Sequence, residues 1–280
     1  MRHSAYFALV FSVVTALLPG CASSQHGDEK YQPRVGQHGK DVIWVPTPDD
    51  LVVKMLETAK VTAGDRVFDL GAGDGKIPIQ AARQFGATAV GIEYNPEMAA
   101  LARRNAQRAG VSDKVTIITG DIFKEDFSKA TVVTMYLLPE LNMRLKPLLL
   151  KMPPGTRVVS HSFDMGSWEA DEVIIGQNNY YGYFWVVPAP VHGQWTLRDA
   201  NGRGLSLKLV QSFQKLQGSV TIAGKSFPLS SGRLSGPQIS LQFYDEQMIP
   251  ISITGSIKGN SLEGMLAAGD RRVEISGRRQ

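Results

Sequence analysis

The stretch VFDLGAGDGK, residues 67–76, is an apolar run that breaks into three glycines at alternate positions, with two aspartates set among them. An apolar run followed by a glycine loop and then a helical pattern predicts a buried strand, a tight turn and a helix. Loops of this kind usually hold phosphates at a helix N-terminus. The two carboxylates, Asp69 and Asp74, therefore need an explanation.

The loop differs from both common phosphate-binding motifs. A dinucleotide fingerprint needs a third glycine at position 76, which is Lys76, and a P-loop needs Ser or Thr where this chain has Ile77. Two carboxylates would also repel a pyrophosphate. S-adenosylmethionine carries an ammonium, a sulfonium and one carboxylate, so an aspartate could bind the ammonium while loop N–H groups bind the carboxylate. The loop thus favours this cofactor over a nucleotide.

Strand and helix patterns alternate around the loop from about residue 44 to residue 190. Helices are expected after Thr47, as N-cap with Pro48 at the first position, over 75–86, after the cap Asn95, and for about ten residues from Pro139. Short apolar runs predict strands at 66–70, 88–93, 114–119, 130–138 and 156–161. Such alternation requires crossover connections, which predicts an α/β fold with a Rossmann-like, doubly wound, mostly parallel sheet.

The pattern changes after Pro190. Seven short alternating segments separated by Gly, Asn, Asp and Ser predict a small antiparallel all-β domain over 191–280, as a meander or barrel. The chain has a formal net charge of +4, and its basic excess is diffuse and lies in this part. Without a run of Lys or Arg and interleaved aromatics, no nucleic-acid partner is expected. The histidines lack metal-ligand spacing, so no metal site is expected either.

The N-terminus resembles that of a bacterial lipoprotein. Apolar residues from Ala5 to Leu18 have the length of a signal-peptide core, and they end at LLPGC, where Cys21 is the single cysteine of the chain. The resemblance implies a signal peptide over 1–21, lipidation of Cys21 and a membrane anchor. Ala22 after the cysteine favours the outer membrane, facing the periplasm. A misassigned start would instead leave the protein in the cytoplasm. Residues 22–40 are expected to be a flexible tether, and 41–190 the α/β domain.

DLGAGDG resembles motif I of the class I S-adenosylmethionine-dependent methyltransferases. In that family an acid after the second strand accepts from the ribose hydroxyls, and Glu93 occupies this position. Asp121, just past the third strand, matches the acceptor for the adenine amino group, with Ile122 beside the ring. The order of these acids across successive strand ends is more specific than any one of them.

A narrower resemblance covers residues 44 to about 165. VPTP, GIEYNP and VTMYLLPEL are similar to segments of the mitochondrial protein-lysine methyltransferases that modify the ATP-synthase c subunit, and to their bacterial branch. The resemblance implies a protein-lysine acceptor, with residues 136–140 lining the acceptor site. A lysine amine must be unprotonated to accept a methyl group, which favours a carboxylate or phenol nearby and makes Tyr136 and Glu140 the candidate catalytic residues. Together the two resemblances imply cofactor contacts from Trp44, Pro46, Asp69, Gly71, Ala72, Gly73, Gly75, Glu93, Tyr94, Asp121 and Ile122.

Two alternatives stay open. His161 and Asp164 could be a base and the residue that orients it, although a hydrogen-bonded structural histidine is the simpler interpretation. An exported protein would also lack the cytosolic methyl donor. The second hypothesis is therefore a non-catalytic binding module that uses the methyltransferase fold to hold a nucleoside-like or cationic envelope ligand.

Overall fold

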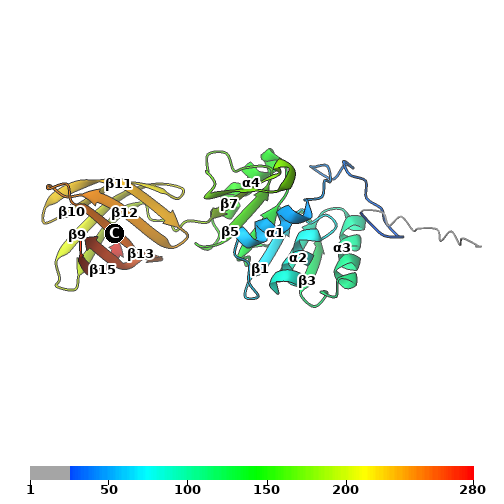
Figure 1. Cartoon of the computed structure of the whole chain (residues 1–280), viewed down its shortest axis with the longest axis horizontal. Helices are drawn as coiled ribbons and strands as arrows, with labels where there is room; N and C mark the ends of the chain where they lie inside the picture. Colours follow the sequence, from blue (N-terminus) through cyan, green and yellow to red (C-terminus); the bar gives the residue numbers. More distant parts are fainter. Residues whose placement is uncertain (1–25) are drawn as a thin grey trace, which may run out of the picture.

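The computed structural model describes residues 26–280, which form an α/β domain followed by a closed β-barrel (Figure 1). The expected signal peptide and Cys21 lie outside the described residues, so both stay predictions. Within 26–280, no helix is long and apolar enough to cross a membrane.

The α/β domain is built on one sheet of seven strands in the order β3-β2-β1-β4-β5-β7-β6. Neighbouring strands among the first five pair in parallel, whereas β7 is antiparallel to β5 and to β6. The mostly parallel sheet expected from the sequence is confirmed, but β6 and β7 had not been predicted. The strands are β1 (Arg66–Leu70), β2 (Thr88–Glu93), β3 (Val115–Thr119), β4 (Val132–Met135), β5 (Arg157–His161), β6 (Glu172–Ile175) and β7 (Tyr181–Val186).

Both faces of the sheet are covered, but unequally. Helices α1 (Asp49–Thr58), α2 (Lys76–Phe85) and α3 (Pro96–Arg108) share one apolar core with one face. The other face, which includes the buried Trp185 ring of β7, packs against α4 (Pro139–Leu149) and against the buried ring of Trp168. Trp168 and the loop that carries it, between β5 and β6, thus take the place of further helices there.

Two of the helix ends predicted from the sequence are confirmed, and the capping residue predicted for a third is wrong. The Asn95 side chain accepts hydrogen bonds from Glu97 N and Met98 N, and Gly86 ends α2 in a left-handed conformation, as predicted. The predicted capping role of Thr47 is wrong, because α1 begins after Pro48 without a side-chain cap. The Thr47 hydroxyl instead lies 3.0 Å from His161 Nδ1.

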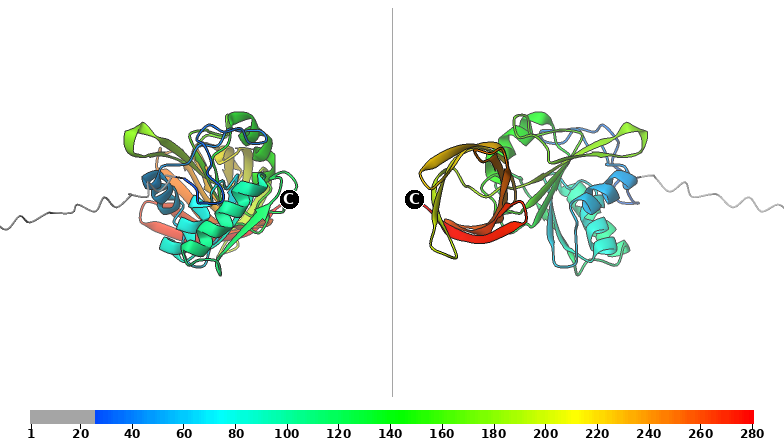
Figure 2. Two further views of the ribbon diagram at one scale, coloured as in Figure 1. Left: turned by 90° about the vertical axis from the view of Figure 1, so that its right-hand side faces the viewer. Right: turned by 60° about the vertical axis from the view of Figure 1, so that its left-hand side comes forward.

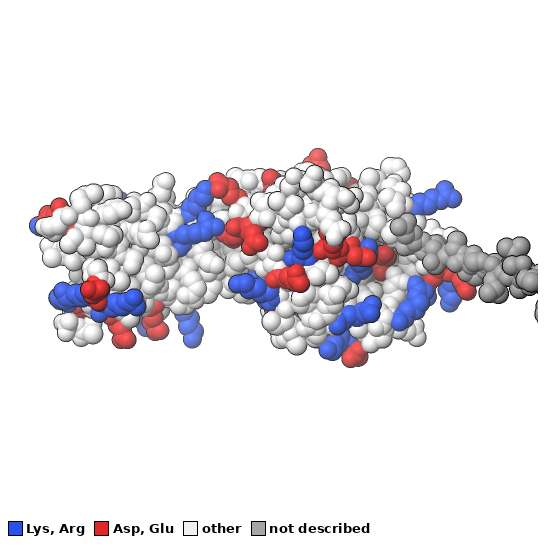
Figure 3. Space-filling view, in the orientation of Figure 1, with Lys and Arg blue, Asp and Glu red and all other residues white. Residues whose placement is uncertain are grey.

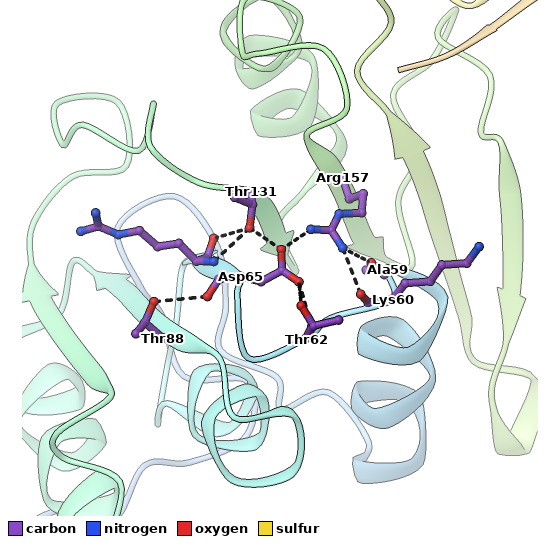
Figure 4. Close-up of polar contacts among 8 residues, drawn as sticks. Ala59, Lys60, Thr62, Asp65, Thr88, Thr131 and Arg157 are labelled. Atoms are coloured by element: carbon purple, nitrogen blue, oxygen red, sulfur yellow. Dashed lines mark hydrogen bonds and ion pairs between the residues drawn. The ribbon is translucent and has the colours of Figure 1, made fainter. Parts of the chain in front are cut away.

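A polar cluster joins the starts of strands β1, β4 and β5 to the end of α1 (Figure 4). The buried Asp65 carboxylate accepts from Thr131 Oγ1 at 2.7 Å and pairs with the Arg157 guanidinium. Arg157 also donates to Ala59 O at 2.7 Å. The cluster lies at the amino ends of these strands, whereas the glycine loop lies at the carboxyl end of β1. It therefore holds together the end of the sheet that is opposite the glycine loop.

The C-terminal part is a closed barrel in which successive antiparallel strands pair and the last pairs with the first (Figure 2). The strands are β8 (Gly193–Asp199), β9 (Gly204–Ser212), β10 (Lys215–Ile222), β11 (Lys225–Ser235), β12 (Gln238–Tyr244), β13 (Pro250–Lys258), β14 (Ser261–Ala268) and β15 (Arg271–Arg279). Alternate side chains fill the interior, including Trp195, Leu207 and Phe243. Strand β11 had not been predicted, because Leu234 is its only buried apolar side chain.

The barrel is docked on the α/β domain through its 212–215 and 235–238 turns. The Phe213 ring stacks on Trp168 with centroids 6.2 Å apart, and Gln214 Nε2 donates to Glu169 O at 2.7 Å. Lys215 pairs with Glu169, and basic and acidic side chains lie side by side along this junction (Figure 3). The junction therefore has an aromatic contact and a polar rim.

Candidate active site

The glycine loop lies at the carboxyl end of β1 and leads into α2. Gly71, Gly73 and Gly75 all have positive φ, at 84°, 54° and 83°. A Cβ at Gly73 would lie 2.6 Å from Trp44 Nε1, so this position needs glycine for its backbone conformation and for space.

The N–H groups of this loop are used inside the protein. Gly71 N and Ala72 N both donate to Ile92 O, at 2.9 and 3.0 Å, and Gly73 N donates to Glu93 Oε2 at 2.9 Å. In this conformation these three groups already have partners inside the protein, so their binding to a ligand carboxylate stays a prediction. Their bonds hold the loop against the end of β2.

Three carboxylates gather around the loop. Asp69 is buried and accepts from Thr134 Oγ1 at 2.7 Å, and burial, with help from the charges of Glu93 and Asp74, raises its pKa to about 7. Burial also raises the pKa of Asp74 and of Glu93. None of the ion pairs within residues 26–280 involves these three acids. A bound cation would offset the free-energy cost of burying these carboxylates in their charged form. The ammonium group of the cofactor could be that cation.

A cavity of 170 Å³ opens beside these acids. It is lined by Asp69, Gly71 and Ala72 at the glycine loop, and by the segment after β4 together with Phe163. Residues 42–47 cover the cavity, and Pro46 is among the residues that line it. The remaining lining residues are Val42, Ile43, Val45, Thr47, Asp74, Lys76, Ile77, Tyr136, Leu137 and Leu138.

Residues 26–47, which we call the N-terminal strap, include most of the segment expected to be a flexible tether. Asp28 instead pairs with Arg104 Nε at 2.5 Å and with Arg108, and the bond to Arg104 holds the pKa of Asp28 well below its usual range. The His26 ring meets the edge of Trp44. These contacts hold the strap against α3, and Trp44 of the strap lies next to Gly73 of the glycine loop. Composition alone gave no signal for them.

Lys40 of the strap lies at the carboxyl ends of β2 and β3. Its Nζ is 2.9 Å from Asp121 Oδ2 and 5.0 Å from the centroid of the Tyr94 ring. Tyr94, Asp121 and Ile122 are outside the cavity lining, and Ile122 packs against the core under α4. A lysine of the same chain thus sits at the acid predicted to bind adenine.

The far wall of the cavity is aromatic. The Tyr136 ring lies 3.8 Å, centroid to centroid, from the ring of His161, and Phe163 is stacked beyond Tyr136. His161 is buried, its Nε2 has no partner within residues 26–280, and burial lowers its pKa to about 4. The imidazole is therefore neutral at physiological pH.

The two remaining sequence candidates lie elsewhere. Asp164 Oδ1 accepts from Gly166 N, so the His161 ring is oriented by Thr47 and not by Asp164. Glu140 is exposed in the first turn of α4 and does not line the cavity. Sequence reasoning had missed Thr47 in this role, along with Thr134, Lys40 and Phe163. No motif marks these residues, because each acts through a contact with a distant segment.

The order of the strands, the acidic glycine loop and the acids at successive strand ends define a class I S-adenosylmethionine-dependent methyltransferase. The family model for the ANTKMT methyltransferase domain matches residues 69–172. A protein-lysine N-methyltransferase of Saccharolobus islandicus is 47% identical over 151 residues, covering 52% of this chain and 94% of the relative. The chain belongs to this family of methyltransferases.

Two further matches are a solved structure, which supports the fold and the cofactor, and a human relative. An RNA methyltransferase from Salinibacter ruber, solved with S-adenosyl-L-homocysteine, is 49% identical with a TM-score of 0.51, covering 52% of this chain and 96% of that chain. The human lysine N-methyltransferase named for the ATP-synthase c subunit is 34% identical over 44% of this chain. The chain spans about half the length of that human relative, 51%. S-adenosylmethionine is the cofactor.

Proposed function

We propose that the protein transfers a methyl group from S-adenosylmethionine to the side-chain nitrogen of a lysine in another protein. The observation that carries the proposal is that Tyr136 and Phe163 face the same cavity as Asp69 and Gly71. Apolar and aromatic side chains in the same cavity as the cofactor loop suit the long alkyl chain of a lysine, whose nitrogen would point toward the methyl donor. The names of the Saccharolobus and human relatives support a lysine acceptor.

Different residues would bind the cofactor, align the reactants and exclude water. Asp69 would hold the cofactor ammonium, and Glu93 would accept from the ribose hydroxyls while keeping its bond to Gly73 N. When bound, the cofactor would supply a methyl group on a sulfonium, whose sulfur leaves readily as a neutral thioether. The chain contributes alignment and exclusion of water, through the strap above the cavity and the aromatic wall beside it.

The acceptor amine has to be unprotonated when it attacks, because its lone pair forms the new carbon–nitrogen bond as the carbon–sulfur bond breaks. Tyr136 faces the cavity and Glu140 does not. We therefore assign the contact with the amine to Tyr136, which is held in place by the neutral His161 ring. Glu140 at the surface is placed to attract a cationic acceptor segment.

The test is a methylation assay with methyl-labelled cofactor, a lysine-rich protein acceptor and, in parallel, RNA, because the Salinibacter structure is described as an RNA methyltransferase. We expect label on lysine, located by mass spectrometry, and none on RNA. Glu93→Ala should abolish transfer by removing the cofactor, and Tyr136→Phe should lower kcat with little change in cofactor affinity. Label on RNA alone would overturn the assignment.

We further propose that the mature protein is an envelope lipoprotein anchored through Cys21, most simply in the outer membrane. Support comes only from the LLPGC stretch. Metabolic labelling with a fatty acid, followed by membrane fractionation, should show label that Cys21→Ala removes. Should the exported protein bind S-adenosylhomocysteine without methylating any acceptor, the non-catalytic binding module would be the better description.

A further inference from the structure

The end of the barrel that faces away from the α/β domain has an open apolar mouth. The turns at 212–215 and 235–238 lie at the docked end. Because successive strands are antiparallel, the turns around residues 200, 224, 247 and 270 lie at the other end of the barrel. Figure 2 shows the barrel from this side as a ring of strands. A cavity of 340 Å³ lies at this end.

Most of the residues that line this mouth are aliphatic. Ile222, Ile251, Leu266 and Val273 line it, each only partly buried, above the fully packed interior formed by residues such as Phe243. Mouths of small barrels are common ligand sites, since the closed sheet leaves side chains there without a neighbour on one side. An apolar chain entering the mouth would remove these four side chains from water.

The rim adds apolar and cationic groups. In the turn that borders Ile251, Met248 is 70% exposed and Ile249 is 45% exposed, although large exposed hydrophobic residues are rare elsewhere on the barrel. Two arginines lie at the lining: Arg203 pairs with Asp199 at 2.7 Å, whereas Arg271 makes no ion pair within residues 26–280. The mouth thus combines an apolar wall with one uncompensated guanidinium.

We propose that the barrel mouth binds a long-chain carboxylate, with its alkyl chain against the aliphatic wall and its carboxylate on Arg271. A guanidinium binds a carboxylate through two parallel hydrogen bonds, which suits a single planar anion. A neutral or cationic chain would leave Arg271 unpaired. This site is separate from the methyltransferase cavity and lies at the opposite end of the barrel from the domain junction.

The experiment is calorimetric titration of the full chain with dodecanoate, below the concentration at which it forms micelles. Dodecyltrimethylammonium is the probe with opposite charge. Arg271→Ala removes the guanidinium, and Ala268→Trp fills the mouth at its rim. Arg278→Ala on the same strand, at the docked end, is the matched control. Thermal melting by circular dichroism checks that each variant is folded.

We expect dodecanoate to bind in the micromolar range, Arg271→Ala to weaken it about tenfold, Ala268→Trp to remove binding, and Arg278→Ala to change nothing. No heat at millimolar dodecanoate would overturn the proposal. Equal affinity for dodecyltrimethylammonium would overturn the role of Arg271. Binding to anionic vesicles that dodecanoate does not compete with would replace the proposal by a membrane contact of the Met248 turn.

Discussion

Asp69 connects the stability of the ligand-free protein to pH. Burial raises its pKa from 3.8 to about 7, so ionisation opposes folding, and the penalty grows as the pH rises from about 4 to 7. Asp69→Asn removes this penalty and can still accept the Thr134 hydrogen bond. We expect the free energy of unfolding at pH 8 to rise by about 2 kcal/mol, with little change at pH 4. Urea unfolding at both pH values measures this, with the exposed Asp113→Asn as control.

The same carboxylate is predicted to make cofactor binding depend on pH. An ammonium needs the ionised form, so the affinity for S-adenosylhomocysteine should fall below pH 7, by at most about tenfold per pH unit. Asp69→Asn should bind at least about tenfold more weakly at pH 8 and lose this dependence. Calorimetry between pH 5.5 and 8 provides the comparison. Unchanged affinity in the variant would remove Asp69 from the site.

Substitution of Lys40 is predicted to strengthen cofactor binding, in contrast to substitution of Asp69. It pairs with Asp121 at 2.9 Å, and the adenine amino group would have to compete for that carboxylate. Lys40→Met should therefore bind S-adenosylhomocysteine about threefold to fivefold more tightly, and added salt should help the wild type but not the variant. Lys54→Met, on the far side of α1, serves as control. Weaker binding by Lys40→Met would show that this lysine supports the cofactor.

At the scale of single residues, the sequence predicted acids whose chemistry a short motif imposes. Asp69 and Glu93 lie at the carboxyl ends of β1 and β2, which are neighbours in one sheet, so their positions come from topology and spacing alone. Lys40, Thr47 and Phe163 were beyond such reasoning. Each reaches the site through a contact across more than 80 positions or from an irregular segment, and no local periodicity records that contact.

At the scale of elements, the Asp65 cluster predicts a stability effect far from the site. Arg157→Met would leave the Asp65 carboxylate, 7% exposed, without its guanidinium and would release the end of α1. We expect a loss of about 3 kcal/mol in the free energy of unfolding. The double variant with Asp65→Asn should recover much of it, and exposed Arg83→Met should have little effect. Urea unfolding of the wild type, the two single variants and the double variant completes a double-mutant cycle.

Element boundaries show where local signals suffice. β1 and β2 occupy the residues predicted for them, because a short buried strand is one apolar run bounded by turns. Strands β6, β7 and β11 were missed for the opposite reason: β6 and β11 bury few side chains, and β7 is rich in aromatic residues of which several stay partly exposed. Such strands are specified by their partners in the sheet, which a single sequence does not reveal.

At the scale of the whole molecule, the two domains meet through a small set of contacts that should make them unfold together. Trp168 is fully buried and the barrel residue Phe213 stacks on it, while Gln214 is 2% exposed at the same junction. The loop that carries Trp168 also carries Phe163 of the cavity wall. Loss of the contacts between the domains should therefore disturb the position of Phe163 in the methyltransferase cavity.

Phe213→Ala tests this coupling in the full chain. The substitution keeps the positive φ of 53° occupied by a residue with a Cβ, so it isolates the loss of the ring from backbone effects. We expect the single calorimetric transition of the wild type to split into two, with the α/β domain melting first, because Trp168 loses its cover. Val210→Ala, an exposed barrel position, should leave one transition. Two transitions in the wild type would mean that the two domains unfold separately and would overturn the predicted coupling.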